Sequence, residues 1–517
     1  MSKDTTGKED GITAKNNLTR RDLALTSLAM GAAAVLPAAG AAQAADVTPE
    51  TPASATAAAI VPSERIGWKR GGTIPAEYYL DEKWYLRDEA YLKQNYWWVV
   101  DHESRIPEAG DYFLFQFGRG DSIIVARDDQ GNINAFHNVC RHRGSRLCLH
   151  DENLPSEAGA GGKRPDAVFS VRQLGQEGNT SVFRCPYHAW TYDLTGKLVS
   201  VPGAANFAPA GFKLDDHGLH PAHVRVAGGF IYASLAAGEP PEFQVPPGGL
   251  EPKLKVAARR THHVKGNWKL VLENFTECYH CGPAHSNSYV RGDWIGDETL
   301  TQTQVEALGG NWDDYLAAAL SGYTWKPDHT QVRGIRGGMG TMAGTGGTPW
   351  HQQPYQSSIG VHYLRPGQEA MTTDGKPACT KLLTGYTDRH APNPGRWASS
   401  VGGLFSFMNG VIASPDYALI YCFIPRGVDR TDAHVAWLVH PDAEEGKDYD
   451  VEHLIALWNN TVREDRWVVE NNHVGLANSR YSGMQPYMPS EIGLINITDF
   501  YMNEMVPAML RAESKKA

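Results

Sequence analysis

The sequence predicts an α+β fold, in which an antiparallel β domain precedes a larger domain that mixes strand-like runs with a long helical stretch. Short β-like runs at 111–117, 122–126 and 133–136 are separated by turn residues, which is typical of antiparallel strands. After residue 250, further strand-like runs lead to one long stretch with helical periodicity at 451–472. The chain has 517 residues, which at roughly 150 residues per domain allows about two to four domains.

Composition and charge exclude several classes of protein. Hydrophobic residues make up 42% and charged residues 21%, as in soluble globular proteins. The net charge is −10 and no basic run exceeds a pair, so we expect no nucleic-acid partner. The seven cysteines are too few, and an odd number, for a scaffold held by disulfides.

The first 45 residues resemble an export signal. A polar segment ends in the pair Arg20-Arg21, an apolar run follows at 23–36, and 42–44 form a small-x-small cleavage pattern. The apolar run is shorter than the roughly 20 residues of a membrane-spanning helix. The paired arginines resemble a twin-arginine signal, so we expect export to the periplasm by that route. An amphipathic N-terminal helix and an uncleaved membrane anchor remain alternatives.

Composition also divides the rest of the chain. An aromatic-rich segment at 76–100 predicts an amphipathic helix leading into a strand, and 151–181 read as a loop inserted in the β domain. Short strands and a Pro-rich linker follow at 220–250. We expect four parts: the signal at 1–45, a leader and helical arm at 46–90, the β domain at 91–245 and the larger domain at 246–517.

The first group of candidate ligands lies in the β domain. Cys140 and His142 form one Cys-x-His loop, and Cys185 and His188 form one Cys-x-x-His loop. Two thiolates and two imidazoles can hold zinc, or a [2Fe–2S] cluster with both cysteines on one iron and both histidines on the other. Zinc modules usually pair like ligands within a loop, so the mixed loops favour the cluster. Zinc and four unconnected core residues remain alternatives.

The second group follows a helix expected from residue 267. His280 and His285 are five residues apart, about 140° on a regular helix, so we expect Gly282-Pro283 to break the helix and bring His285 back. Two imidazoles and one carboxylate make a facial triad that leaves positions open on Fe(II) for O₂. Alone, such a pair is more often two separate surface histidines.

Together, these two groups and their flanking motifs resemble the α subunits of Rieske non-haem iron oxygenases over about residues 84–505. The resemblance implies an antiparallel Rieske [2Fe–2S] domain and a helix-grip, START-like catalytic domain with one mononuclear Fe(II). The family's motifs match the cluster ligands Cys140, His142, Cys185 and His188, and the iron ligands His280, His285 and, on a late helix, Asp465.

The family pattern also assigns neighbouring residues. The acidic residue three before the first histidine is Glu277 here, where many members have Asp, and it bridges the two centres, usually across a subunit boundary. Asn274 is a further candidate catalytic residue. Glu464 faces about 100° away from Asp465 on a helix and is the less expected ligand. Cys148 is expected to be a buried non-ligand.

One departure from the family is the spacing between the cluster loops. Residues 143–184, 42 in all, separate them, which implies an insertion of about 25 residues within 151–181.

The resemblance implies an enzyme that hydroxylates a small organic substrate with O₂ and electrons from a donor protein. The donor is a reductase, a ferredoxin or, after export, a cytochrome. We expect a homo-oligomer, a trimer or larger.

The motifs look closest to the branch acting on quaternary ammonium compounds such as glycine betaine, stachydrine and carnitine, where N-methyl hydroxylation releases formaldehyde. A cation would need aromatic faces, and candidates in the region that usually lines the pocket are Trp312, Tyr323, Trp325, Trp350 and Trp397. The alternatives are an aromatic-ring-hydroxylating dioxygenase α subunit and a non-catalytic Rieske electron-transfer protein. Oxidising conditions would also allow Cys278 to pair with Cys281.

Overall fold

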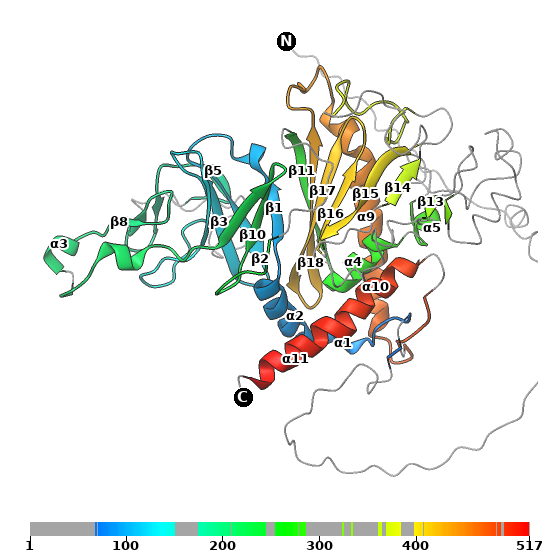
Figure 1. Cartoon of the computed structure of the whole chain (residues 1–517), viewed down its shortest axis with the longest axis horizontal. Helices are drawn as coiled ribbons and strands as arrows, with labels where there is room; N and C mark the ends of the chain where they lie inside the picture. Colours follow the sequence, from blue (N-terminus) through cyan, green and yellow to red (C-terminus); the bar gives the residue numbers. More distant parts are fainter. Residues whose placement is uncertain are drawn as a thin grey trace, which may run out of the picture. The chain divides into compact units, whose positions relative to one another are not determined.

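The elements that the computed structural model describes all lie within Ala59–Ala517 (Figure 1). The residues it describes are 68–69, 71–149, 174–207, 209–243, 254–277, 279–285, 323–324, 332–333, 360–363, 369–383, 398–406, 408–481, 483–487 and 491–515. The expected export signal, most of the expected insertion, and Cys278 lie outside these residues, as do the side chains of the five aromatic pocket candidates.

A short helical arm precedes the β domain. Asp81 caps the second helix by accepting a hydrogen bond from the Lys83 backbone, and Asp88 is fully buried on the same helix. Asp88 accepts hydrogen bonds from Trp268 Nε1 (3.1 Å) and Tyr501 Oη (2.8 Å), which ties the arm to the C-terminal domain. The elements of this part are α1 (Glu77–Leu80), α2 (Glu82–Asn95), β1 (Trp98–His102) and the 3₁₀ turn η2 (Glu103–Arg105).

Three small antiparallel sheets form the β domain, with strand orders β4-β3-β2-β5, β1-β10-β9 and β6-β7-β8. Both faces of β2 are buried, since Phe113 and Phe115 enter one hydrophobic cluster and Tyr112 and Leu114 enter another. The bounds are β2 (Asp111–Phe117), β3 (Asp121–Arg127), β4 (Ile133–His137), β5 (Glu177–Asn179), β6 (Phe183–Arg184), β7 (Thr191–Tyr192), β8 (Leu198–Ser200), α3 (Ala204–Phe207), η4 (Leu214–His217), β9 (His223–Ala227) and β10 (Phe230–Ser234).

The end of the expected insertion is not a loop. Residues 177–179 form β5, the edge strand that pairs antiparallel with β2. The prediction missed it because a three-residue strand containing Gly178 carries no alternating pattern.

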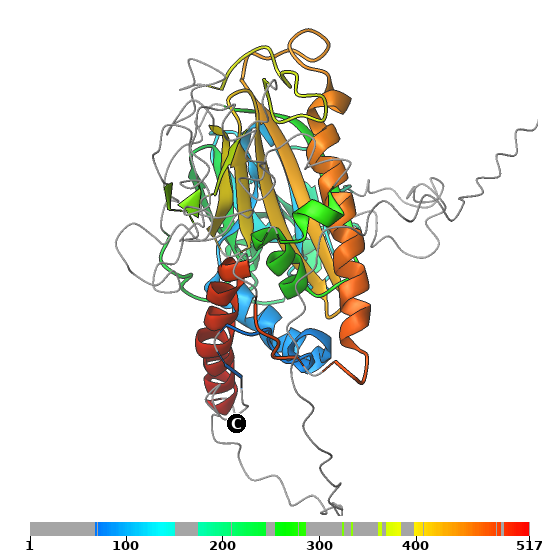
Figure 2. The same ribbon diagram turned by 90° about the vertical axis from the view of Figure 1, so that its right-hand side faces the viewer.

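The C-terminal domain is built on a six-stranded antiparallel sheet of order β11-β18-β17-β16-β15-β14, with a separate β12-β13 pair (Figure 1). Figure 2 shows α9 running along this sheet, where it contacts β11. The bounds are β11 (Lys255–Val264), α4 (Trp268–Thr276), α5 (Cys281–Ala284), β12 (Tyr323–Thr324), β13 (Val332–Arg333), β14 (Gly360–Tyr363), β15 (Ala398–Ser406), β16 (Asn409–Ala413), β17 (Ala418–Gly427), β18 (Arg430–Val439), α9 (Val451–Leu476), α10 (Ile492–Phe500), the π-helical turn η8 (Tyr501–Met505) and α11 (Val506–Ser514).

The central strand β17 is buried along nearly its whole length because both of its faces are covered. The β domain packs against it through β1 and β2, and α4 packs against it through Phe275, whose ring lies 4.9 Å from that of Tyr421. Gly410 on the neighbouring strand permits this approach, since a Cβ there would come within 2.6 Å of Phe275. The sheet therefore holds α4 firmly.

The helix break near the two histidines differs from the prediction in its place. Helix α4 ends at Thr276, and the next residue, Glu277, has an extended backbone. Pro283 lies inside the short helix α5 instead of breaking it. Proline is tolerated in a first helical turn because its missing N–H has no partner there. The return of His285 therefore depends on the extended Glu277. Among the described helices, none combines the length and apolarity required to cross a membrane.

Candidate metal centres

The two cysteine loops of the β domain share one backbone turn. The Gly144 amide donates a hydrogen bond to the Cys140 carbonyl, and the Ala189 amide donates one to the Cys185 carbonyl. The donor–acceptor distance is 3.0 Å in both. In both loops the fourth residue after the cysteine has a positive φ, +75° at Gly144 and +58° at Ala189. This shared turn brings the two expected ligands of each loop together.

The four expected cluster ligands divide by depth. Cys140 and Cys185 are buried, with 2% and 1% of their surface exposed, whereas His142 is exposed and His188 is half-buried. The histidine rings lie 4.6 Å apart. A Rieske cluster needs this arrangement, with the thiolate-bound iron inside and the imidazole-bound iron at the surface.

Hydrogen bonds favour a thiolate at Cys185. The Cys140 thiol and the backbone amides of Tyr187 and His188 hold the pKa of Cys185 below its usual range, against the effect of burial. Cys148 shows the contrast, because burial alone raises the pKa of its thiol. As expected, Cys148 lies in the core.

Aromatic rings hold both imidazoles. Trp190 stacks on His142 with ring centroids 4.8 Å apart, and Tyr187 stacks on His188 at 3.8 Å. The Arg143 guanidinium lies over Tyr187, 5.2 Å from its centroid. The segments 138–149 and 183–190 contain four arginines and no carboxylate, so these two loop segments carry a net positive charge.

The second centre lies where α4, α5 and α9 meet. One oxygen of Asp465, Oδ1, lies 3.1 Å from His280 Nε2 and 2.9 Å from His285 Nε2. The structure therefore brings together the three expected iron ligands, which come from segments about 180 residues apart.

Carboxylates also hold the outer nitrogen of each imidazole. His280 Nδ1 lies 2.5 Å from Glu277 Oε1, and His285 Nδ1 lies 2.9 Å from Glu464 Oε2. With Nδ1–H donated to these carboxylates, each ring would have the lone pair of Nε2 available for a metal ion held beside Asp465, which is the tautomer that a metal ligand needs.

Sequence reasoning set Glu464 aside as a ligand and did not assign it this role. Glu464 directly precedes Asp465 on α9, about 100° away around the helix axis. That position was the sequence feature that could have indicated a carboxylate next to the iron ligands.

The electrostatics of this centre suit a cation. Burial opposes protonation of His280, but Asp465 and Glu277 raise its pKa to about 10. Burial also opposes ionisation of Asp465, but the two imidazoles lower its pKa to about 2. Three carboxylates around two imidazoles thus stabilise positive charge, which a divalent metal ion would supply, and the donor set fits mononuclear iron.

Two further residues border the three donors. The Asn274 amide nitrogen lies 3.2 Å from His280 Nε2, so this predicted site residue faces the inner side of the centre. Cys281 Sγ lies within 4.8 Å of the histidine donor atoms. Because Cys281 is disulfide-bonded, it has no thiolate to offer a metal.

Comparisons with known families agree with both centres. A model described as "Rieske [2Fe-2S] domain" matches residues 96–213, and one described as "Ring hydroxylating alpha subunit (catalytic domain)" matches residues 250–505. The glycine betaine monooxygenase oxygenase subunit of Chromohalobacter salexigens is 31% identical over 447 residues, covering 84% of this chain and 86% of that protein.

Solved structures share the fold. The quaternary ammonium Rieske monooxygenase CntA, in complex with its substrate γ-butyrobetaine, superposes with a TM-score of 0.53 at 18% identity, covering 86% of this chain and 99% of CntA. Naphthalene 1,2-dioxygenase from Rhodococcus sp. superposes with a TM-score of 0.53 at 19% identity, covering 84% and 94%.

Proposed function

Because this chain belongs to the family of Rieske non-haem iron oxygenase α subunits, we propose that it N-demethylates a quaternary ammonium compound by hydroxylating an N-methyl group. The family assigns it one [2Fe–2S] cluster and one mononuclear iron per chain. The substrate class is supported by its similarity to a glycine betaine monooxygenase over most of both chains. An acidic centre also favours a cationic substrate nearby.

The observation that carries the enzymatic proposal is the convergence of His280, His285 and Asp465 on one point. A protein that only carries electrons would not need this second donor set. When bound, the iron supplies the oxidation of a C–H bond with O₂, and the cluster supplies the electrons.

The protein's own residues hold and orient these groups. Glu277 and Glu464 fix the two imidazole rings, and Asp465 provides an anionic oxygen between them. An iron ion held by His280, His285 and Asp465 would lie beside Asn274, whose amide nitrogen is 3.2 Å from His280 Nε2. Protein hydrogen bonds of this kind tune both the affinity and the reactivity of a metal.

We further propose that Glu277 couples the iron centre to the cluster of a second copy of this chain. Two features support it. Glu277 keeps 12% of its side chain exposed while it holds His280, and the cluster loops carry positive charge that suits a carboxylate. This proposal requires a homo-oligomer.

Export by the twin-arginine route is also a proposal, supported by the motif within residues 1–45. In the periplasm the electron donor would be a reductase, ferredoxin or cytochrome available in that compartment.

Metal content and product formation test the function together. We expect about three irons and two acid-labile sulfides per chain, with the electron paramagnetic resonance (EPR) signal of a reduced Rieske cluster. Dithionite-reduced enzyme should release formaldehyde from glycine betaine or carnitine under O₂. Hydroxylation of naphthalene without formaldehyde release would instead support the ring-hydroxylating alternative. Two irons per chain, both in the cluster and none at the mononuclear site, would overturn both the N-demethylase and the ring-hydroxylase proposals.

A further inference from the structure

A sulfur atom lies beside the iron ligands and has no part in the proposed function. Cys281 directly follows His280 in the chain and is the first residue of α5. Its carbonyl accepts a hydrogen bond of 3.0 Å from the His285 amide. The residue is 4% exposed, and its Sγ lies within 4.8 Å of the donor atoms of both histidines. The fold therefore holds this sulfur close to the point where the iron ligands meet.

This sulfur is bound in a disulfide. Five of the seven cysteines of the chain are free: Cys140, Cys148, Cys185, Cys379 and Cys422. The remaining cysteine, Cys278, is therefore the partner of Cys281. The two form a Cys-x-x-Cys pair, the spacing of many dithiols that are oxidised and reduced reversibly, and His280 lies inside it.

The state of this disulfide decides how many donors the centre presents. A disulfide offers no thiolate, which leaves His280, His285 and Asp465 as a facial triad with open positions. After reduction, Cys281 adds a thiolate to these donors. Two imidazoles, one carboxylate and one thiolate make up a four-donor set of the kind that holds zinc in a closed tetrahedral site.

The distances allow this fourth bond. Zinc bonds of about 2.0 Å to nitrogen and about 2.3 Å to sulfur place the two donor atoms about 3.5 Å apart in a tetrahedral site. Because Cys281 Sγ already lies within 4.8 Å of both histidine donors, a movement of about 1 Å closes the site. Release from Cys278 frees the sulfur to make this movement.

We propose that the disulfide between Cys278 and Cys281 sets the metal selectivity of this centre. In the oxidised protein the centre takes iron as an open triad. In the reduced protein Cys281 completes a zinc site that has no position left for O₂. This inference rests on the proposed function for the role of the iron.

The redox step balances with a dithiol as the reductant. The dithiol supplies two electrons and two protons, so the S–S bond between Cys278 and Cys281 breaks, two S–H bonds form, and the dithiol becomes a disulfide. When zinc then binds, the Cys281 thiol releases its proton to solvent. Exchange with an oxidised thiol such as glutathione disulfide restores the bond between the two cysteines.

Two variants separate the thiol from the cross-link. Cys278→Ser and Cys281→Ser both abolish the disulfide, but only Cys278→Ser keeps the thiol beside the histidines. An effect of the lost cross-link on folding is common to both variants. A difference between them therefore reports the sulfur donor itself.

Zinc affinity is measured on the full chain with its cluster intact and its mononuclear iron removed by a chelator. Competition with a chromophoric zinc indicator gives the Kd before and after reduction with tris(2-carboxyethyl)phosphine. We expect reduction of the wild type to tighten zinc binding more than about 10-fold, since even groups behind the ligands change metal affinity by about 10- to 100-fold. Cys278→Ser should bind zinc tightly without reductant, and Cys281→Ser should bind it weakly with or without reductant.

Cobalt(II) in place of zinc reports the sulfur bond directly. A thiolate-to-cobalt charge-transfer absorption should appear in the reduced wild type and in Cys278→Ser, and should be absent from the oxidised wild type and from Cys281→Ser. Acid-labile sulfide, measured in each sample, should show that the cluster is unchanged.

The outcomes distinguish this inference from the proposed function. Equal zinc affinity in the oxidised and reduced wild type, or in the two serine variants, would overturn the inference. Alkylation of both Cys278 and Cys281 before any reduction would also overturn it, because no disulfide would then exist. If the oxidised, iron-loaded enzyme releases no formaldehyde while zinc binding still depends on reduction, the proposed function fails and the zinc site remains.

Discussion

At the scale of single residues, both centres depend on groups that are not themselves ligands. Glu277 and Glu464 each bind the outer nitrogen of one histidine, and aromatic rings stack on both cluster imidazoles. These partners fix the tautomer and orientation of the ligands, which the ligand residues alone would leave free.

Asp465 and Glu464 are adjacent, yet we expect different effects from their loss. Asp465→Ala should abolish mononuclear iron binding and formaldehyde release, because it removes a donor, while the cluster stays intact. Glu464→Gln should keep the iron site but weaken its affinity on the order of 10- to 100-fold. Iron and sulfide analysis after dialysis checks both; equal iron loss in the two variants would contradict the assignment.

Ala189 has a backbone conformation that favours glycine. Its φ is +58°, in the loop of Cys185 and His188, so Ala189→Gly should raise the free energy of unfolding by about 1 kcal/mol. Gly144 is the matched control, since its φ is +75° and a Cβ there would meet no atom within 4 Å. Gly144→Ala should therefore destabilise by about 1 kcal/mol, through backbone strain alone. Thermal unfolding of the loaded protein measures both; changes of the same sign would contradict this explanation.

At the scale of elements, the strongest patterns are confirmed by the structure. The long helical stretch became α9, capped by Asp450, and the β-like runs became β2, β3 and β4. Elements lacking a pattern were missed, such as β5 and the C-terminal helices. The helix break was misplaced, because Pro283 fits a first turn and the extended Glu277 decided the bend.

The contact of α4 with the sheet depends on Gly410, which has no Cβ to collide with Phe275. Gly410→Ala should push Phe275 and α4 away from β16 and cost about 1–3 kcal/mol of unfolding free energy. Because α4 leads into the iron site, iron affinity should fall as well. Gly475→Ala, near the exposed end of α9 with open space around its Cβ, should be neutral or slightly stabilising. Denaturant unfolding measures the free energy of unfolding of both variants. An equal change in Gly410→Ala and Gly475→Ala would contradict the packing explanation.

At the scale of the whole molecule, a buried polar network links the N-terminal arm, α4 and the C-terminal helices. Tyr79 donates to Glu273 over 2.7 Å, and Tyr501 and Trp268 donate to Asp88. The arm therefore contributes to the stability of the helix that precedes the iron ligands, although it lies far from them in sequence.

Glu273 makes stability depend on pH. Burial raises its pKa from 4.5 to about 7, with Glu491 and Glu277 adding to the rise and Tyr79 and Lys269 opposing it. The folded state then binds more protons than the unfolded state between these values, so stability falls as pH rises from about 4.5 to 7.

The variant Glu273→Gln should remove this dependence and be more stable above pH 7 by up to about 2 kcal/mol, less than the full shift because Glu273 is partly exposed. Unfolding at pH 5 and pH 8 measures it, with the exposed Glu452→Gln as control. If the free energy of unfolding changed equally with pH in the wild type and in Glu273→Gln, Glu273 would not be the cause of the pH dependence.

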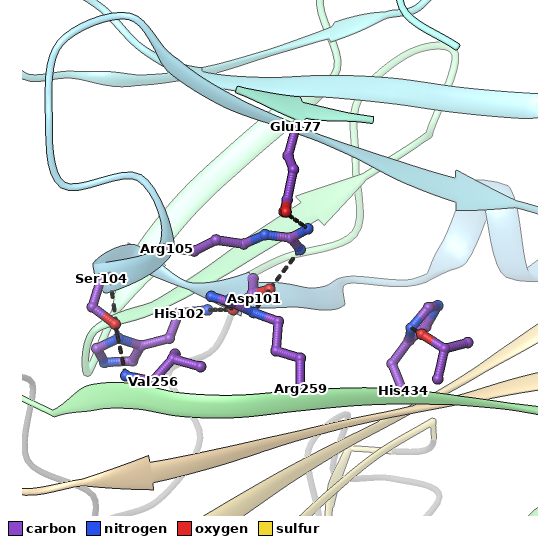
Figure 3. A network of polar contacts seen from close by, with 9 residues as sticks. Asp101, His102, Ser104, Arg105, Glu177, Val256, Arg259 and His434 are labelled. Atoms are coloured by element: carbon purple, nitrogen blue, oxygen red, sulfur yellow. Dashed lines mark hydrogen bonds and ion pairs between the residues drawn. The ribbon is translucent and has the colours of Figure 1, made fainter. Parts of the chain in front are cut away.

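The sequence by itself determined the fold class, the family and the seven candidate ligands, because ligand spacing and strand or helix periodicity are local properties of the chain. Only the tertiary structure decided which groups meet: Asp465 with two histidines some 180 residues earlier, Glu464 behind His285, and Asp101 with Arg259 (Figure 3). Such contacts depend on where the sheet, its bulges and the extended Glu277 direct the chain. That direction follows from packing between distant segments, which no local pattern encodes.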